Sequence, residues 1–109
     1  MQRMGMVIGL KADKIEEYKQ LHAAVWPEIL ALISSCNIRN YSIYLREPEN
    51  LLFGTWEYHG TDFKADMARM ASNMDNQKWW AVCMPCQQPL PTRKEGEWWA
   101  MMDEVFHLD

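Results

Sequence analysis

Tyr18 and His22 are the two residues whose types and spacing most clearly suggest chemistry. They lie four residues apart in the stretch EEYKQLHAAVWPEI, residues 16–29, whose apolar positions repeat with helical spacing. Residues at i and i+4 share one face of a helix, about 6 Å apart along its axis. The phenol and the imidazole could therefore enter one cavity, and histidine is suited to general acid or base catalysis because its reference pKa is about 6.5. A hydrogen-bonded histidine with a purely structural role is the alternative.

Pro27 follows this pair and predicts a break in the same helix. Because proline has no backbone N–H, the carbonyl of Ala23 lacks its helical donor. We expect the helix to bend or loosen just after His22. We also expect a small polar molecule to bind against the face that Tyr18 and His22 share.

Two pairs of adjacent tryptophans, Trp79–Trp80 and Trp98–Trp99, are candidates for a ligand wall. Neighbouring side chains point in different directions on a helix and to opposite faces on a strand. If Trp98–Trp99 lies on a strand, one ring for each sheet face explains the pair. Trp79–Trp80 falls on a short predicted helix beside an irregular loop. There, either core packing or stacking against the C–H face of a sugar would account for the rings.

Motifs for metal, redox or nucleotide chemistry are weak or absent. Cys83 and Cys86 form a C-x-x-C, but it ends a short predicted helix instead of opening one after a strand, so a redox pair or zinc site is not favoured. His22, His59 and His107 lack the short ligand spacing of a metal site, and we expect no metal. The sequence has no glycine-rich phosphate loop and no nucleotide-binding fingerprint.

The elements that would position these residues follow a definite order. Asp13 and Glu16 form a capping pair that predicts where the first helix begins. The predicted elements are a strand at 3–10, a helix at 13–35, strands at 38–47 and 51–60, a helix from 61 or 62 that buries Phe63, Met67 and Met70, a break at 71–75, a short helix at 76–85 and a closing strand at 97–108. This β-α-β-β-α-(α)-β order predicts an α+β, ferredoxin-like fold, with an antiparallel sheet, helices on one face, and a single domain over residues 1–109.

The predicted strands carry large side chains on both faces. In the strand at 38–47, regular alternation places Arg39, Tyr41, Ile43 and Leu45 on one face and Ile38, Asn40, Ser42 and Tyr44 on the other. Helices would cover only one face of the sheet. The uncovered face must be buried against something, most simply a second copy of the chain, so we expect a homodimer.

Composition sets the broad class of protein. The chain has 109 residues, 49% of them hydrophobic, which is enough for one modest core. A formal net charge of −4 without any basic run argues against nucleic acid or an anionic membrane as partner. No apolar stretch approaches the length of a membrane span, and no secretory signal is visible. With three cysteines, an odd number, we expect a reduced, cytoplasmic protein.

The YxxxH…WPE, NYxIYL and QKWW elements, in this order and spacing, resemble the L-rhamnose mutarotase family, and the similarity runs nearly end to end through the closing EVFHL. The resemblance implies a cytoplasmic homodimer with a dimeric α/β-barrel fold that interconverts the α and β anomers of L-rhamnose without a metal or organic cofactor. It implies that His22 is the proton donor and that the sugar-binding residues are Tyr18, Tyr41, Trp79 and Trp80. It implies no role for the C-x-x-C.

Mutarotation opens a cyclic hemiacetal to the aldehyde and recloses it on the other face. A proton must reach the ring oxygen and another must leave the anomeric hydroxyl. His22 could supply the first, while water, Tyr18 or a carboxylate could take the second. Two other functions remain open at this point. One is a non-catalytic module that binds a small sugar in the same pocket, and the other, by fold analogy alone, is a cofactor-free monooxygenase.

Overall fold

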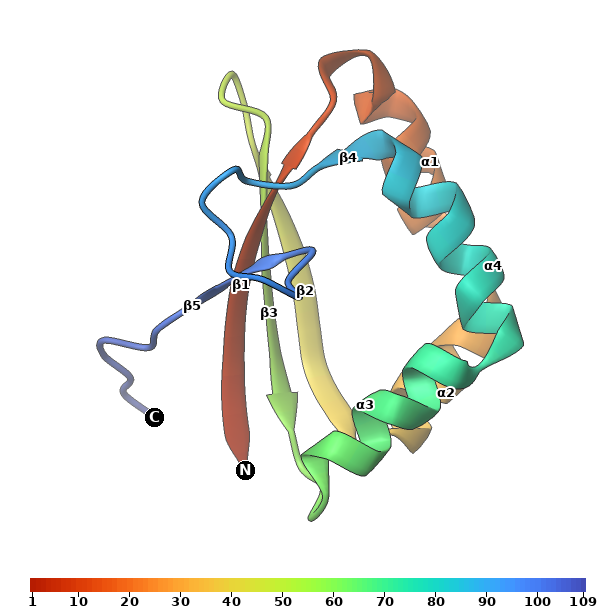
Figure 1. The fold of residues 1–109 in the computed structure, drawn as a ribbon, viewed down its shortest axis with the longest axis vertical. Helices are drawn as coiled ribbons and strands as arrows, with labels where there is room; N and C mark the ends of the chain where they lie inside the picture. Colours follow the sequence, from red (N-terminus) through yellow and green to blue (C-terminus); the bar gives the residue numbers. More distant parts are fainter.

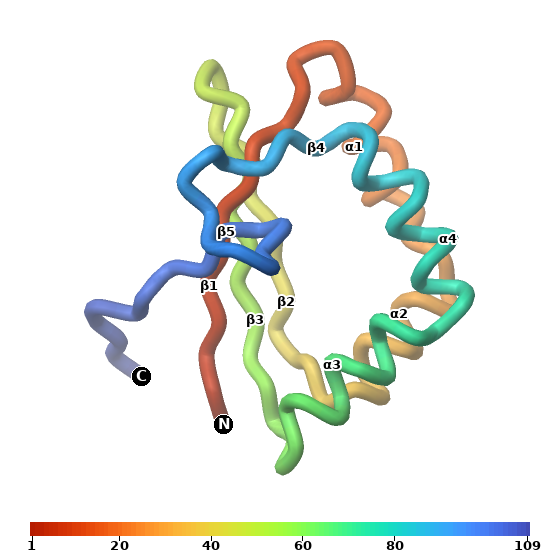
Figure 2. The backbone as a smooth tube through the Cα atoms, in the orientation of Figure 1, coloured from red at the N-terminus to blue at the C-terminus, as the bar shows by residue number.

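A computed structural model describes the chain from Met1 to Asp109, and its centre is one curved antiparallel sheet (Figure 1). The helices form an arc on one side of this sheet (Figure 2). The strands are β1 (Gln2–Leu10), β2 (Ile38–Arg46), β3 (Leu51–Tyr58), β4 (Gln87–Gln88) and β5 (Ala100–Met102), and the helices are α1 (Ile15–Ala23), α2 (Pro27–Ser35), α3 (Phe63–Ser72) and α4 (Met74–Cys83). Two 3₁₀ turns, η1 (Ala12–Lys14) and η2 (Met84–Cys86), precede α1 and follow α4.

The strand order confirms the predicted ferredoxin-like fold. The strands lie in the order β2-β3-β1-β4, and β5 also pairs with β1. All of the pairings are antiparallel. Each half of the chain places a strand, then two helices, then the next strand, and all four helices cover the same face, as a split βαβ arrangement requires.

The first helical region differs from the prediction at both ends of α1. A single helix over 13–35 was wrong, because α1 ends at Ala23 and α2 begins at Pro27. Trp26 has the extended ψ of 134° that a following proline favours, and Pro27 occupies the first helical turn, where its missing N–H costs nothing. The break expected just after His22 is therefore confirmed. The predicted cap is wrong: Asp13 lies inside η1, and no side chain caps the start of α1.

A bulge in β2 changes which residues share a face. The register with β3 shifts between Arg39 and Ser42, and Asn40 adopts a positive φ of 52°, which asparagine tolerates better than most residues. Ile38 consequently faces the helices together with Tyr41 and Ile43, whereas regular alternation had placed Ile38 on the other face. The side-chain amide of Asn40 donates a hydrogen bond to the carboxylate of Glu57.

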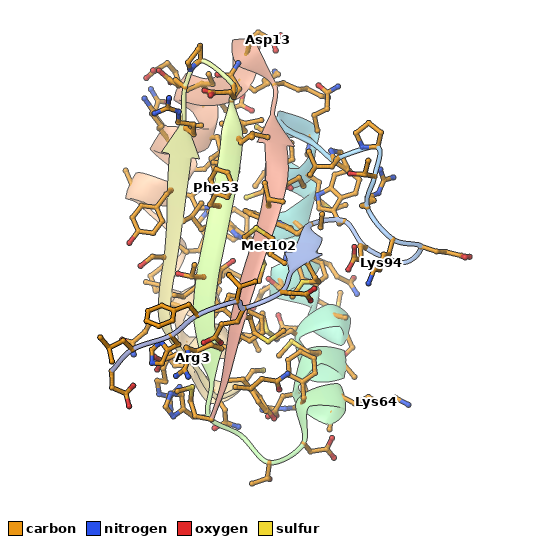
Figure 3. The ribbon with its side chains drawn as sticks, turned by 90° about the vertical axis from the view of Figure 1, so that its left-hand side faces the viewer. Arg3, Asp13, Phe53, Lys64, Lys94 and Met102 are labelled. Atoms are coloured by element: carbon orange, nitrogen blue, oxygen red, sulfur yellow. The ribbon has the colours of Figure 1, made fainter.

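The closing strand is much shorter than predicted. Only Ala100–Met102 pairs with β1, and residues 103–109 have no regular structure. This tail crosses the helix-free face of the sheet (Figure 3), where Glu104 forms an ion pair with Arg3 at 3.3 Å. Trp98 and Trp99 precede β5, and both pack against the core between sheet and helices. The expectation of one ring for each sheet face was therefore wrong.

The core fills the space between the sheet and the helices, and it includes part of the candidate site. Tyr18 and Trp79 pack in one cluster with Ile8 and Ile29, which are 0% and 1% exposed. Side chains that lie this deep hold fixed rotamers because a packed interior leaves few alternatives. The apolar stripe predicted for α3 is also present, as Phe63, Met67 and Met70 pack against a second cluster around Met6 and Trp56. None of the helices is long and apolar enough to cross a membrane.

Candidate active site

The concave side of the sheet contains a cavity of about 350 Å³ between the strands and the helices. All five residues singled out from the sequence line it: Tyr18 and His22 from α1, Tyr41 from β2, and Trp79 and Trp80 from α4. Hydrophobic residues make up 14 of the 16 that line the cavity. A mainly apolar wall with a few polar groups is typical of a site for a small molecule.

Tyr18 and His22 stack face to face, as their i, i+4 spacing predicts. The centroids of their rings lie 4.1 Å apart with the planes inclined by 25°. The centroid of the Trp79 ring lies 5.4 Å from that of the imidazole, with the planes tilted by 59°, and Trp79 meets Trp26 edge-on at 5.0 Å. The break before Pro27 brings Trp26 into this cluster, so the interruption of the helix helps to fix the position of the histidine.

One hydrogen bond determines which nitrogen of His22 can react. The Nδ1 atom lies 3.0 Å from the backbone carbonyl oxygen of Tyr18. A carbonyl oxygen can only accept, so Nδ1 carries the hydrogen and the neutral ring has its lone pair on Nε2. Burial lowers the pKa of His22 below its ordinary value, and the hydrogen bond to the Tyr18 carbonyl opposes this only in part. At neutral pH His22 is thus an uncharged base at Nε2.

The two phenols of the cavity are hydrogen-bonding groups rather than acids. Burial raises the pKa of Tyr18 well above its usual range, and removal of the Tyr41 hydroxyl from bulk water raises its pKa to about 12. Both hydroxyls therefore keep their protons throughout the physiological range. They can donate to or accept from the hydroxyls of a polar ligand.

The two adjacent tryptophans of α4 differ in how deeply they are buried. Trp79 is 7% exposed and belongs to the core cluster, whereas Trp80 is 37% exposed. Both rings line the cavity. Core packing therefore accounts for Trp79, while a ligand wall stays a prediction for the pair.

Gln87 is a cavity residue that the sequence analysis missed. It is 6% exposed, its Nε2 lies 3.4 Å from the Tyr18 hydroxyl, and its Oε1 accepts from Trp98 Nε1 at 2.7 Å. The segment from 87 to 96 reads as a loose loop in the sequence, with nothing local to mark one glutamine. Its position depends on β4 pairing with β1, a contact between distant parts of the chain.

The remaining candidates are the cysteines and the two other histidines. The three cysteines are free and buried, and burial raises the pKa of Cys83 to about 12 and that of Cys86 to about 11. These thiols stay protonated and so are poor nucleophiles. His59 is on the surface, 2.9 Å from Glu57, and His107 lies in the C-terminal tail. No three side chains of the histidine, cysteine, aspartate and glutamate types are grouped so that they could hold a metal ion.

The fold and the cavity together define a class: a small α+β protein of ferredoxin-like topology whose concave aromatic cavity contains one neutral histidine. The family model described as L-rhamnose mutarotase matches residues 3–108. The chain is 32% identical to the L-rhamnose mutarotase of Oceanobacillus iheyensis over 109 residues, covering 100% of both chains. It is 36% identical to that of Escherichia coli O8 over 106 residues, covering 97% of each.

Solved structures agree with the sequence comparisons. A crystal structure of L-rhamnose mutarotase from Formosa agariphila superposes with a TM-score of 0.80 at 25% identity, covering 100% of both chains. Tetracenomycin F2 cyclase from Streptomyces glaucescens superposes with a TM-score of 0.74 at 13% identity, covering 100% of this chain and 98% of the other, and this likeness concerns the fold alone. The chain belongs to the L-rhamnose mutarotase family.

Proposed function

We propose that this protein is an isomerase that interconverts the α and β anomers of L-rhamnose, with His22 as the group that moves the proton. The observation that carries the proposal is the meeting of Tyr18, His22, Tyr41, Trp79 and Trp80 at one cavity, with the lone pair of a neutral imidazole left free. Family membership supports the choice of sugar.

The walls of the cavity suit a deoxy sugar. Indole rings offer flat surfaces on which the C–H face of a pyranose can stack, and the accessible ring of Trp80 is the candidate for that contact. The hydroxyls of Tyr18 and Tyr41 are the polar partners for the oxygen atoms of the sugar. The mainly apolar lining also favours a methyl group over a hydroxymethyl group, because a buried hydroxyl without a partner is costly.

A single histidine can serve both proton transfers of ring opening. Neutral His22 takes the proton of the anomeric hydroxyl at Nε2 while the bond between the anomeric carbon and the ring oxygen breaks, which leaves a carbonyl at that carbon. The imidazolium then gives this proton to the ring oxygen, which has just left the same carbon and so is still within reach of the same nitrogen. After rotation of the aldehyde, the reverse sequence closes the other anomer.

In this order of proton transfers, His22 is itself the base, whose identity residue types alone left open. His22 also remains the proton donor to the ring oxygen. No proton is gained or lost over the cycle. Acid–base assistance of this kind is worth about 10²- to 10⁴-fold. That is sufficient for a reaction that already proceeds in water.

NMR saturation transfer between the two anomeric proton signals of L-rhamnose tests the proposed activity. We expect the intact protein to accelerate exchange well above the rate in buffer, and to act less well on sugars with a hydroxymethyl group in place of the methyl group. Binding of L-rhamnose, seen as a change in tryptophan fluorescence, without faster exchange would instead support a non-catalytic sugar-binding module.

We further propose that the working form is a cytoplasmic homodimer joined through the helix-free face of the sheet. Val7, Phe53 and Tyr44 form an apolar row across three adjacent strands on this face, with Phe53 paired to both of the others. Figure 3 shows Phe53 on β3. Tyr44 is 64% exposed in the single chain, and Phe106 of the C-terminal tail is 80% exposed. A second copy would cover these rings. The odd number of cysteines fits a reducing compartment.

A further inference from the structure

The Tyr18 hydroxyl is held by a short chain of hydrogen bonds that begins at Trp98. The indole Nε1 of Trp98 lies 2.7 Å from Oε1 of Gln87, and Nε2 of Gln87 lies 3.4 Å from the Tyr18 hydroxyl. The second contact is long for a hydrogen bond, as contacts at a catalytic site often are before a substrate is bound.

The chemistry of the three groups fixes the direction of this chain. An indole nitrogen can only donate, so the carbonyl oxygen of the Gln87 amide must face Trp98. The amide nitrogen, which also can only donate, must then face Tyr18. The oxygen of the Tyr18 hydroxyl accepts this bond, and its own hydrogen is left to be donated into the cavity.

Several contacts keep Gln87 in place beside α1. Gly9 pairs with Gln88 and Leu10 with Gln87, and the backbone N–H of Lys11 donates to the carbonyl of Cys86 at 2.9 Å. The Cys86 thiol donates to Glu17, the residue directly before Tyr18, at 3.0 Å. The second cysteine of the C-x-x-C thus has a structural explanation, because it ties the segment that carries Gln87 to the helix that carries Tyr18.

We propose that Trp98 and Gln87 are positioning residues that orient the Tyr18 hydroxyl as a hydrogen-bond donor to the ring oxygen of the bound sugar. This inference rests on the proposed mutarotase function. In ring opening, negative charge develops on the ring oxygen as its bond to the anomeric carbon breaks. A donor aimed at that oxygen stabilises the transition state more than the ground state. Because burial keeps Tyr18 protonated, it donates this bond without losing its proton.

The first test is a double-mutant cycle on the rate of anomer exchange. Trp98→Phe keeps an aromatic ring and removes the indole N–H, and we expect kcat to fall about two- to tenfold, the range of one hydrogen bond, with KM little changed. In a Tyr18→Phe background, Trp98→Phe should cause no further loss, because the group it orients is gone. Equal losses in both backgrounds would overturn the proposal and indicate a packing role for Trp98.

The second test reverses the direction of the chain. An ionised glutamate at position 87 can only accept, so Gln87→Glu would draw the Tyr18 hydrogen away from the sugar, whereas a protonated carboxyl can imitate the amide. Relative to wild type at each pH, Gln87→Glu should therefore lose activity as pH rises through the titration of the new carboxyl. Gln87→Met, the matched variant without charge, should show a loss that does not change with pH. Parallel profiles for the two variants would contradict the proposal.

A third measurement separates failure of the positioning chain from failure of the proposed function. The indole N–H of Trp98 gives its own NMR signal, and loss of its acceptor in Gln87→Met should move that signal, with or without sugar. If wild type does not accelerate anomer exchange, the proposed function fails. If the Trp98 signal does not move, the positioning chain fails, whatever the activity.

Discussion

The bond between His22 Nδ1 and the Tyr18 carbonyl decides how the histidine can act. It leaves Nε2 as the reactive atom, and burial of the ring favours the neutral form. A histidine free in solution would be partly protonated near its ordinary pKa of about 6.5. In this cavity the imidazole is ready to accept a proton at neutral pH. In the mechanism that we propose, the reaction therefore begins with His22 as a base, and the protonated ring becomes the donor one step later.

This account predicts the pH dependence of catalysis. The neutral form is the active one, and the pKa of His22 is lowered, so kcat/KM should be constant at neutral pH and fall as pH drops through that lowered pKa. The midpoint should lie below pH 6.5, the ordinary value. The measurement is the exchange rate from pH 4.5 to 8, corrected at each pH for exchange in buffer alone. A midpoint at or above 6.5 would show that burial does not control this histidine.

Among the secondary-structure elements, the two-residue strand β4 matters more to the site than its length suggests. It brings Gln87 next to Tyr18, and it can do so only because Gly9 of β1 has no side chain. A Cβ atom on Gly9 would lie 2.5 Å from the backbone oxygen of Gln88. That distance is far too short for a carbon and an oxygen atom, so β4 would have to move.

Gly9→Ala is therefore expected to lower both activity and stability. We expect a loss of about 1–3 kcal/mol in the free energy of unfolding, as for other overpacked sites, together with reduced anomer exchange. Gly5→Ala is the matched control on the same strand, because its Cβ would lie an ordinary 3.6 Å from Met102. Denaturant titration and the exchange assay measure the two effects. Equal behaviour of the two variants would mean that β4 does not depend on the close approach at Gly9.

Short-range sequence patterns predicted the features that depend only on residues close together in the chain. The i, i+4 spacing of Tyr18 and His22 and the proline after them predicted a shared helix face and a break, and both are present. The bulge at Asn40 and the short strand β5 were not predictable in this way. Each depends on how one strand registers against another that is distant in sequence. Gln87 escaped notice for the same reason, since its neighbours in space come from other parts of the chain.

At the scale of the whole molecule, the sheet is covered by helices on one face and by a short tail on the other. The tail crosses this second face, held by the ion pair between Arg3 and Glu104. Exposed ion pairs contribute little, with values of about 0–1 kcal/mol, so the tail alone is a weak cover for the apolar row of Val7, Phe53 and Tyr44. A second chain is the partner that we propose for this surface.

Phe53→Lys tests the proposed dimer. A charge at the centre of the apolar row would remain unpaired in the interface, so the variant should be monomeric at concentrations where wild type is dimeric. Light scattering coupled to size-exclusion chromatography measures the mass of each. Lys64→Glu, in α3 at the side of the molecule and away from the apolar row, is a control that also changes one surface charge and should leave the mass unchanged (Figure 3). A monomeric wild-type protein would rule out this interface.

The central claim is that His22 moves the proton in anomer exchange, and NMR saturation transfer on L-rhamnose with His22→Ala tests it most directly. His59→Ala, on the surface and outside the cavity, is the matched histidine control. Circular dichroism establishes that both variants fold. The account predicts that His22→Ala loses about 10²- to 10⁴-fold of the catalysed rate while His59→Ala keeps it. A folded His22→Ala protein with the full wild-type rate would contradict the account.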